Sequence, residues 1–404
     1  MCDTLCAPGA GGMVFAKNSD RPPGEAQVTW PFGRRTSNGC TLRTQYLSIG
    51  DHGSCATLLS CPTWLWGAEH GVNEYGVAIG NERVSTTHDA KSASPALIGM
   101  DLVRLGLERA RTAEHAVETI TGLLEVHGQG GIADAVHGEA YDSSFLVADP
   151  TGAFVVETAG AEWAVAPVPH GGAISNRLDL GTGWTRASGH LAPGDDFDRY
   201  RDHHEDTRYA DVRLAASRRF LAATAPDGLT PASTAAHLRD HGNGPWGAPG
   251  DHGQVDPPPT GVGEDFSGVS VCMHVRGLSV TAASMIAVLP GAIGEGAPLR
   301  VYVAAGSPCA SIYVPAFPRT AAGPPPFVPM ELSSEELWRA ADEVRDLVES
   351  APDALAEVRG VLAAVEDELW AEADDVWERP NRWSNIGATW GARALHGLRS
   401  CIPS

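Results

Sequence analysis

The hydrophobic and polar positions of the chain fall into blocks of strand-like and helix-like pattern. The opening residues predict a β-hairpin, with strands over 2–8 and 13–17 joined by a glycine-rich turn at 9–12. Glycine supplies the positive φ angles that such tight turns require. A second pair of strand-like runs lies within 63–84, around a turn at 73–76. We therefore expect the first part of the chain to be rich in β-structure.

Residues 99–128 change to a helical pattern, in which apolar side chains recur every three or four positions. Thr112 is a suitable N-cap between two helices, and Gly128 is a suitable stop. Strand-like runs return over 143–168, and a second helical region follows over 205–240. Because strands and helices occur in separate blocks, the pattern predicts an α+β protein with layered sheets rather than an alternating parallel sheet.

A change in composition near residue 318 predicts the domain organisation. We expect one large domain over 2–318, a proline-rich joint over 319–331, and a mostly helical C-terminal extension over 332–404. The acidic segment 332–378 has apolar residues at helical spacing, which is typical of amphipathic helices that pack on a core. The pattern leaves a partner-binding role for this extension open.

Composition and charge narrow the range of partners. The 404 residues are 43% hydrophobic and 20% charged, as in ordinary globular proteins. The formal net charge of −21 argues against binding to nucleic acid or to an anionic membrane by bulk electrostatics. No apolar run approaches the roughly 18–20 residues that span a bilayer. The opening residues lack the basic and apolar regions of a secretory signal, so we expect a cytoplasmic protein.

The cysteines and histidines do not predict a metal site from their spacing. None of the eight cysteines forms a Cys-x-x-Cys pair, and we expect most of them to be reduced and buried. The acidic and histidine-rich stretch 202–206 reads as a solvated charged segment, because adjacent histidines cannot share one helix face. His274 is expected to be structural. The sequence therefore implies neither a metal nor an organic cofactor.

Cys2 is the residue whose position suggests chemistry. Initiator methionine is normally removed when the next side chain is small, which would leave an α-amine and a thiol on one residue. The reference pKa values are about 7.7–8.0 for the amine and about 8.5 for the thiol, so the amine can accept the thiol proton. N-terminal threonine enzymes combine nucleophile and base in this way. Taken alone, Cys2 is more simply a buried strand residue that has no catalytic role.

The predicted hairpin would bring charged residues of its second strand beside Cys2. Closing the hairpin places Lys17, Asn18, Asp20 and Arg21 near the start of the first strand. A lysine ammonium lowers the pKa of a neighbouring thiol, and a carboxylate can hold an α-ammonium group by a charge-assisted hydrogen bond. Charged residues at a strand end are also commonly just solvated.

Several short stretches, in order along the chain, resemble one family. They are "CDT" at 2–4, "FAKNSDRPPGEAQ" at 15–27, "WGAEHGVNEYGVAIGNE" at 66–82, "GMDLVRLGLERA" at 99–110, "ISNRLDLG" at 174–181, "SVCMH" at 270–274, "ASMIAVLP" at 283–290 and "SPCASIYVP" at 307–315. The chain resembles the secernin and cysteine-dipeptidase family of N-terminal nucleophile (Ntn) hydrolases, relatives of bile-salt hydrolases and penicillin V acylases. The resemblance implies an αββα four-layer sandwich, with the nucleophile at the start of an inner strand.

The resemblance also implies roles for individual residues. Cys2 would be both nucleophile and base, and Asp20 would orient its amine. Lys17 stands where the bile-salt hydrolase relatives have arginine, so it would be a neighbour of the thiol. Asn176 would donate its amide N–H to the developing oxyanion. Asn81 would be a second oxyanion donor, although the spacing before it departs from the bile-salt hydrolase pattern.

Three further positions follow from the resemblance and from the second hairpin. The segment "ASRRF" resembles one that brings an arginine to the site, and its place before Phe220 favours Arg219 over Arg218. Glu69 and Glu82 lie on the two arms of the second hairpin, where either could bind a substrate amine. Both could equally lie on a solvated strand edge.

These residues together predict a cytosolic amidohydrolase with a dipeptidase-like activity on a small peptide or related amide. Cys2 would form a thioester, which water then hydrolyses. Two alternatives stay open: an acyltransferase or amide synthase in which an amine replaces the water, and a non-catalytic interaction protein on the same fold. The sequence also leaves open whether the chain forms a homo-oligomer.

Overall fold

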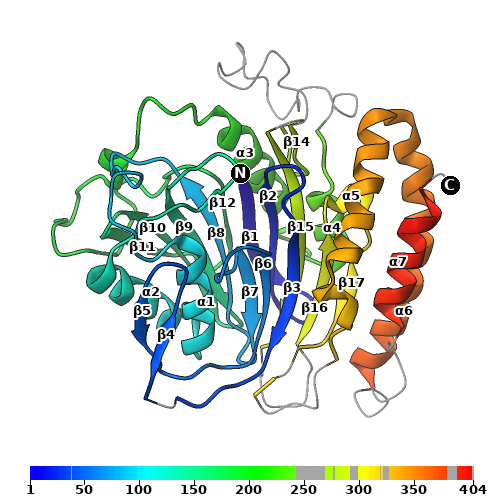
Figure 1. Ribbon diagram of the computed structural model, residues 1–404, viewed down its shortest axis with the longest axis horizontal. Helices are drawn as coiled ribbons and strands as arrows, with labels where there is room; N and C mark the ends of the chain where they lie inside the picture. The colour runs from blue at the N-terminus through cyan, green and yellow to red at the C-terminus, as the bar shows by residue number, and fades with distance from the viewer. Residues whose placement is uncertain are drawn as a thin grey trace.

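Two antiparallel sheets face one another in the computed structural model, with helices on their outer sides (Figure 1). The structure describes residues 1–37, 39–242, 269–275, 278–291, 299–318, 320–321, 327–379 and 389–402. The strands of the first sheet are ordered β12-β1-β2-β15-β16-β17, and β14 pairs with β15. Its members are β1 (Cys2–Gly9), β2 (Gly12–Arg21), β12 (Gly172–Ile174), β14 (His274–Val275), β15 (Ser279–Leu289), β16 (Arg300–Ala305) and β17 (Val314–Ala316).

The second sheet has eight strands in the order β13-β11-β10-β9-β8-β7-β6-β3. They are β3 (Gln27–Phe32), β6 (Thr57–Pro62), β7 (His70–Asn73), β8 (Ala78–Val84), β9 (Asp142–Asp149), β10 (Gly152–Ala159), β11 (Glu162–Pro167) and β13 (Arg186–Ala187). A separate pair is formed by β4 (Thr41–Arg43) and β5 (Ser48–Gly50).

Both predicted hairpins are confirmed. β1 and β2 pair from Cys2 with Ser19 to Gly9 with Gly12, so the second strand runs four residues beyond its predicted end at 17. β7 and β8 form the second hairpin around residues 73–76, but residues 63–69 before it are not in a strand. The first hairpin lies inside its sheet, with β12 on one side and β15 on the other.

Alternation of side chains along the first hairpin defines the layers. Leu5 and Ala16 pack in one apolar cluster with Leu214 and Leu238 of the helices outside the first sheet. Cys6 and Phe15 point the other way, into the core between the two sheets. The outer helices are α3 (Arg208–Thr224) and α4 (Pro231–Leu238) on the first sheet, and α1 (Gly99–Arg109) and α2 (Ala113–His127) on the second. The αββα prediction is therefore confirmed.

Helix ends follow the local signals read from the sequence. Thr112 Oγ1 accepts a hydrogen bond of 3.1 Å from the backbone N–H of His115, and Gly128 adopts a φ of 68° after the last turn of α2. The helical region predicted over 205–240 is confirmed as α3 and α4. Short 3-10 helices are η1 (Phe197–Tyr200), η2 (Pro308–Ala310), η3 (Met330–Ser333) and η4 (Pro352–Ala354).

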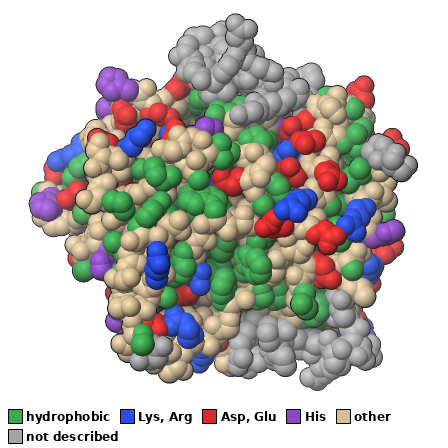
Figure 2. Space-filling view, viewed as in Figure 1, with side chains coloured by type: hydrophobic (Ala, Val, Ile, Leu, Met, Phe, Trp, Pro, Cys, Tyr) green, Lys and Arg blue, Asp and Glu red, His purple; other side chains and the backbone are tan. Residues whose placement is uncertain are grey.

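The C-terminal helices lie beside β16 and β17 (Figure 1). They are α5 (Glu335–Ser350), α6 (Leu355–Glu378) and α7 (Trp390–Ser400). Val344, Leu369 and Trp390 are buried in the same cluster as Phe317, which follows β17. Acidic and basic side chains lie next to one another over this part of the surface (Figure 2). No helix in the described part of the chain is both long and apolar enough to cross a bilayer.

The proposed division into a domain over 2–318 and an extension over 332–404 stays a prediction. Within the joint over 319–331, residues 319 and 322–326 lie outside the described residues. The same holds for residues 380–388 and 403–404 of the extension, whose described part is mostly helical.

Candidate active site

A cavity of about 780 Å³ lies at the end of the sandwich where β1 begins. Its wall contains Cys2, Asp20, Glu69 and Asn176, which the sequence predicts to be site residues, together with Tyr209 of α3. These residues come from β1, β2, the start of the second hairpin and the segment after β12. Sheet pairing therefore brings together positions that are up to 174 residues apart in sequence.

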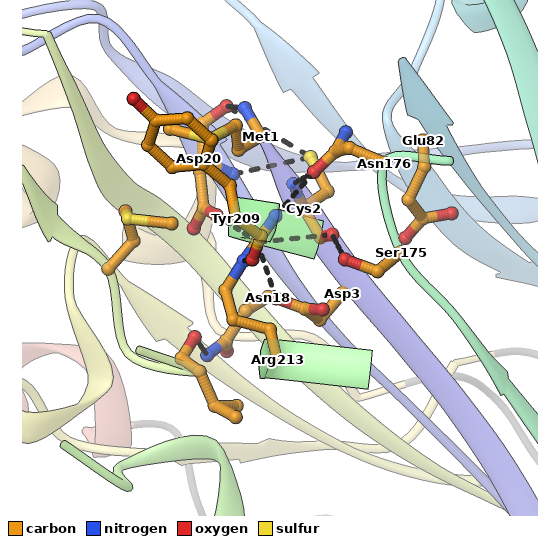
Figure 3. A network of polar contacts seen from close by, with 12 residues as sticks. Met1, Cys2, Asp3, Asn18, Asp20, Glu82, Ser175, Asn176, Tyr209 and Arg213 are labelled. Atoms are coloured by element: carbon orange, nitrogen blue, oxygen red, sulfur yellow. Dashed lines mark hydrogen bonds and ion pairs between the residues drawn. The ribbon is translucent and has the colours of Figure 1, made fainter. Parts of the chain in front are cut away.

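The Cys2 thiol is buried at the edge of this cavity, with 4% of the residue exposed. Its Sγ accepts the backbone N–H of Asp20 at 3.4 Å (Figure 3). The same sulfur lies 3.9 Å from Ser19 Oγ. Burial raises the pKa of the thiol, and the charge of Lys17 opposes that rise. The position is set by the ladder, because Cys2 is paired with Ser19 across the hairpin.

Asn176 holds the main-chain nitrogen of Cys2. The Cys2 N–H donates to Asn176 Oδ1 at 2.7 Å (Figure 3). Asn176 Nδ2 donates to the carbonyl oxygen of Arg83 at 2.9 Å. Asn176 lies two residues beyond β12, whose pairing with β1 delivers it to this place. The two residues are thus together as expected, but it is the amide oxygen that contacts Cys2. The role of Asn176 as an oxyanion donor stays a prediction.

Arg213 connects the acidic and amide groups around Cys2, and it is not among the residues predicted from the sequence. Its side chain is fully buried on α3. Nη1 lies 2.6 Å from Asp3 Oδ2 and 3.2 Å from Asp20 Oδ2. Nη1 also donates to the Cys2 carbonyl oxygen at 3.3 Å, and Nη2 donates to Asn176 Oδ1 at 2.7 Å. One guanidinium group therefore contacts Cys2 and three of its neighbours.

The choice of Arg219 as the site arginine is corrected by this geometry. Arg219 lies six residues after Arg213 on α3 and is exposed, as is Arg218, which pairs with Asp179. At 3.6 residues per turn, six residues correspond to a rotation of about 120° away from the Arg213 direction. One feature of the sequence could have identified Arg213: it lies between Val212 and Leu214. A charged residue inside an apolar stretch of a helix needs a buried partner.

Asp20 lies beside the chain terminus. Its Oδ1 accepts from Thr281 Oγ1 at 2.8 Å, in addition to the contact of Oδ2 with Arg213. Its backbone N–H donates to the Met1 carbonyl oxygen at 2.9 Å, and the Met1 nitrogen donates to the Asp20 carbonyl oxygen at 3.3 Å. Burial raises the pKa of Asp20, and the terminal ammonium group and Arg213 oppose the rise.

Lys17 lies between the two sheets, fully buried. Its Nζ donates to the Asn81 carbonyl oxygen at 2.6 Å and pairs with Glu82 Oε1 at 3.2 Å. Thr4 Oγ1 donates to the same Glu82 oxygen at 2.5 Å. Gly80 makes this approach possible, because a Cβ atom there would lie 2.8 Å from Lys17 Cδ and 2.9 Å from Thr4 Oγ1.

The two predicted substrate carboxylates lie in different surroundings. Glu69 lines the cavity, and its Oε1 pairs with Arg21 Nη1 at 3.0 Å. Glu82 is fully buried against Lys17. Asn81 lies next to Glu69, and the amide orientation that satisfies both groups has its Nδ2 2.9 Å from Glu69 Oε2. Of the two, Glu69 is the carboxylate that a molecule in the cavity can reach.

The charged stretch 202–206 forms part of the cavity wall. His203, His204 and Glu205 are exposed, as expected of a solvated segment, and they line the cavity with Arg83. Their place in the cavity wall was not predicted, because it depends on the bridge that Arg201, after η1, makes with Thr86, after β8.

Comparison with known proteins gives the following likenesses. No family model matches the chain. Penicillin V acylase from Agrobacterium tumefaciens is 15% identical, over 78% of this chain and 84% of that one, with a TM-score of 0.46. The Caenorhabditis elegans ortholog of N-acylethanolamine-hydrolyzing acid amidase is 12% identical, over 72% and 94%, with a TM-score of 0.37. A mutant of conjugated bile acid hydrolase from Clostridium perfringens is 12% identical, over 74% and 88%, with a TM-score of 0.41.

Proposed function

We propose that this chain is an amidohydrolase of the Ntn type, related to the secernins and cysteine dipeptidases, whose nucleophile is Cys2. One observation carries the proposal: the Cys2 nitrogen and sulfur are each held by a defined partner at the wall of a cavity of about 780 Å³. A buried strand residue without a role needs neither the Asn176 oxygen nor the Arg213 guanidinium at its nitrogen and carbonyl groups. Such a converging set of polar groups is typical of a catalytic site.

The proposed reaction begins once Met1 has been removed. The Cys2 nitrogen is then an α-amine with a reference pKa of about 7.7–8.0, so much of it is neutral near pH 8. The amine takes the thiol proton, and Sγ forms a bond to the substrate carbonyl carbon. The C–N bond then breaks as the α-ammonium group returns the proton to the leaving amine. Water hydrolyses the resulting thioester, releasing the acid and regenerating the thiol.

Neighbouring groups support each step of this scheme. The Lys17 ammonium group favours the thiolate form of Cys2 against the effect of burial. Asn176 Nδ2 carries two protons, one of which is given to Arg83, and we assign the other to the oxyanion. Asn81 is the proposed second donor. Asp20 and Arg213 keep the start of β1 in register with β2.

The charge of the cavity supports a substrate with a free amine. In the described part of the chain, six carboxylate side chains and three arginines line it. An excess of negative charge in a partly enclosed cavity raises the local concentration of cations. We propose that Glu69 receives the α-ammonium group of a small peptide, which gives a dipeptidase-like activity. None of the cysteines in the described residues is in a disulfide, which fits the cytoplasmic location that we propose.

Turnover of a dipeptide panel by four forms of the protein tests this proposal. Cys2→Ala lacks the nucleophile and should be inactive. Cys2→Ser keeps both groups but has a much less acidic nucleophile, so it should retain only a trace of activity. Protein whose α-amine has been acetylated keeps the thiol and loses the base, and it should also be inactive. Cys61→Ser removes another buried thiol and should behave as wild type.

Three outcomes would contradict the proposal or change its class. Normal turnover by the acetylated form would show that another group is the base. Failure of Cys2 to react with a thiol-directed amide probe would favour the non-catalytic interaction protein. Formation of a new amide when free amines are added would favour the acyltransferase, because the thioester then reacts with an amine in place of water.

A further inference from the structure

Two histidines and two cysteines from separate segments of the chain meet at one place in the fold. They are His241 after α4, Cys272 and His274 at β14, and Cys309 in η2, and their ligand atoms all lie within 4.8 Å of one another. The last three are buried, and His241 is partly buried. We propose that these four side chains bind a structural zinc ion.

The distances from His274 to the two sulfur atoms fit tetrahedral coordination. His274 Nε2 lies 3.4 Å from Cys272 Sγ and 3.3 Å from Cys309 Sγ. With Zn–S near 2.3 Å and Zn–N near 2.0 Å, a tetrahedral site has S···N separations of about 3.5 Å. A ring nitrogen has either one proton or one lone pair, so it cannot make a good hydrogen bond to both sulfurs at once. A metal ion at the centre contacts all the groups together.

An outer partner orients His274 for this role. Its Nδ1 lies 2.8 Å from Glu349 Oε1 on α5, and Arg345 Nε lies 3.5 Å from the same carboxylate oxygen. A proton on Nδ1, shared with this carboxylate, leaves the lone pair of Nε2 directed at the cluster. Ligating histidines in zinc proteins commonly have such a carboxylate partner. The His241 ring meets the His274 ring edge-on, with centroids 5.1 Å apart.

The ligand types favour zinc and a structural site. Two thiolates and two imidazoles are a typical donor set for Zn²⁺, and four protein ligands leave no open position for substrate. The site would fasten four parts of the fold, since the ligands follow α4, precede β15 and lie in η2, with Glu349 on α5. The expectation of no metal came from sequence spacing, which cannot detect ligands that only the fold assembles.

The cluster is also connected to the proposed active site. Cys272 and His274 flank Met273, whose backbone N–H donates to Thr281 Oγ1 at 2.9 Å. Thr281 Oγ1 in turn donates to Asp20 Oδ1 at 2.8 Å. A zinc ion that fixes both neighbours of Met273 would therefore also fix the support of Asp20. This last step rests on the proposed function, whereas the metal site does not.

Metal content of the full-length protein is the first test. Protein purified without chelators and then dialysed should retain about one zinc ion per chain, as a closed four-ligand site does. The double variant Cys272→Ser, Cys309→Ser should lose it. Cys61→Ser, which removes a buried thiol elsewhere, should keep it. Equal zinc content in the double variant and the wild type would place the metal elsewhere and overturn the proposal.

Spectroscopy of the wild type keeps the proposal testable even if the serine variants do not fold. Zinc absorption fine structure should show two sulfur neighbours at about 2.3 Å and two nitrogen neighbours at about 2.0 Å. Cobalt(II) exchanged into the site should give tetrahedral d–d bands and thiolate-to-cobalt charge transfer. Wild-type protein that retains no zinc and binds no cobalt, or that contains a Cys272–Cys309 disulfide by mass, would show the proposal to be wrong. None of these readings depends on turnover at Cys2.

Discussion

The charged side chains near Cys2 are buried together with side chains of opposite charge. Arg213 faces Asp3 and Asp20, and all three are buried. Burial raises the pKa of Asp3 to about 7, against the opposing effect of Arg213. Removing one member of a buried charge group leaves its partners uncompensated, which costs about 3–5 kcal/mol of stability. The arginine is therefore as important for the fold around β1 as for the orientation of Cys2.

Arg213→Met should lower both stability and activity. We expect a loss of about 3–5 kcal/mol in the free energy of unfolding and a large fall in kcat, because the Cys2 and Asn176 contacts disappear. Urea unfolding and steady-state kinetics measure the two effects. Arg219→Met separates the structural assignment from the sequence-based one: a comparable loss of kcat there would restore Arg219 to the site.

Asn176 can be tested for two roles separately. If its N–H donates to the oxyanion, Asn176→Ala should lower kcat by about 10²–10³-fold. Asn176→Asp keeps an oxygen for the Cys2 nitrogen and for Arg213 but has no N–H to donate. Loss of kcat in both variants supports the oxyanion role. Near-normal turnover by the aspartate variant, with an unchanged circular dichroism spectrum, would leave Asn176 only its contact with the Cys2 nitrogen.

At the level of elements, the local signals of the sequence were sufficient for the hairpins and helices. The β1–β2 turn and the cap at Thr112 are decided by residues within a few positions of one another. Arg213 and the zinc cluster could not be read in this way, since each depends on contacts across 30 to more than 200 residues. The family resemblance helped where motifs are short. It failed at "ASRRF", because it does not show on which face of α3 each arginine lies.

The close packing of β8 on the first hairpin gives a test at this scale. Gly80→Ala would place a Cβ 2.8 Å from Lys17 Cδ and 3.2 Å from Phe15 Cζ. We expect a loss of about 1–3 kcal/mol in the free energy of unfolding, as for other overpacked cores. Gly122→Ala on α2 is the matched control, since nothing lies within 4 Å of its added Cβ. It should raise helix stability by about 0.5–1 kcal/mol. Equal unfolding midpoints for the two variants would contradict the packing described here.

For the molecule as a whole, several carboxyl groups are buried in the core rather than exposed on the acidic surface. Burial raises the pKa of Glu157 to about 8 and that of Asp101 to about 7, although both accept backbone hydrogen bonds. In such a group the folded state holds its proton more tightly than the unfolded state. The stability that it contributes is fully present below the unfolded pKa and is lost as pH rises through the folded pKa.

The melting temperature should therefore fall as pH rises from about 5 to about 9. Glu157 dominates the upper part of that range, where its shift corresponds to a few kcal/mol at about 1.4 kcal/mol per pKa unit. Glu157→Gln should flatten the profile between pH 7 and 9, while keeping an oxygen for the backbone N–H of Asp179. Glu118→Gln, at an exposed position of α2, should leave the slope unchanged. A wild-type melting temperature that rises over this range would refute the prediction.

The pairing of Met1 with Asp20 sets an order of events during biosynthesis. Both main-chain groups of Met1 are engaged with β2, so the bond between Met1 and Cys2 lies inside a sheet ladder once the hairpin has closed. A processing peptidase needs that segment extended and free. On the proposed chemistry, we expect methionine removal to precede closure of the hairpin that β1 and β2 form. A chain whose hairpin closes before Met1 is removed should keep Met1. Such a chain would lack the free α-amine of Cys2 that the proposed mechanism uses as its base, and it would be inactive.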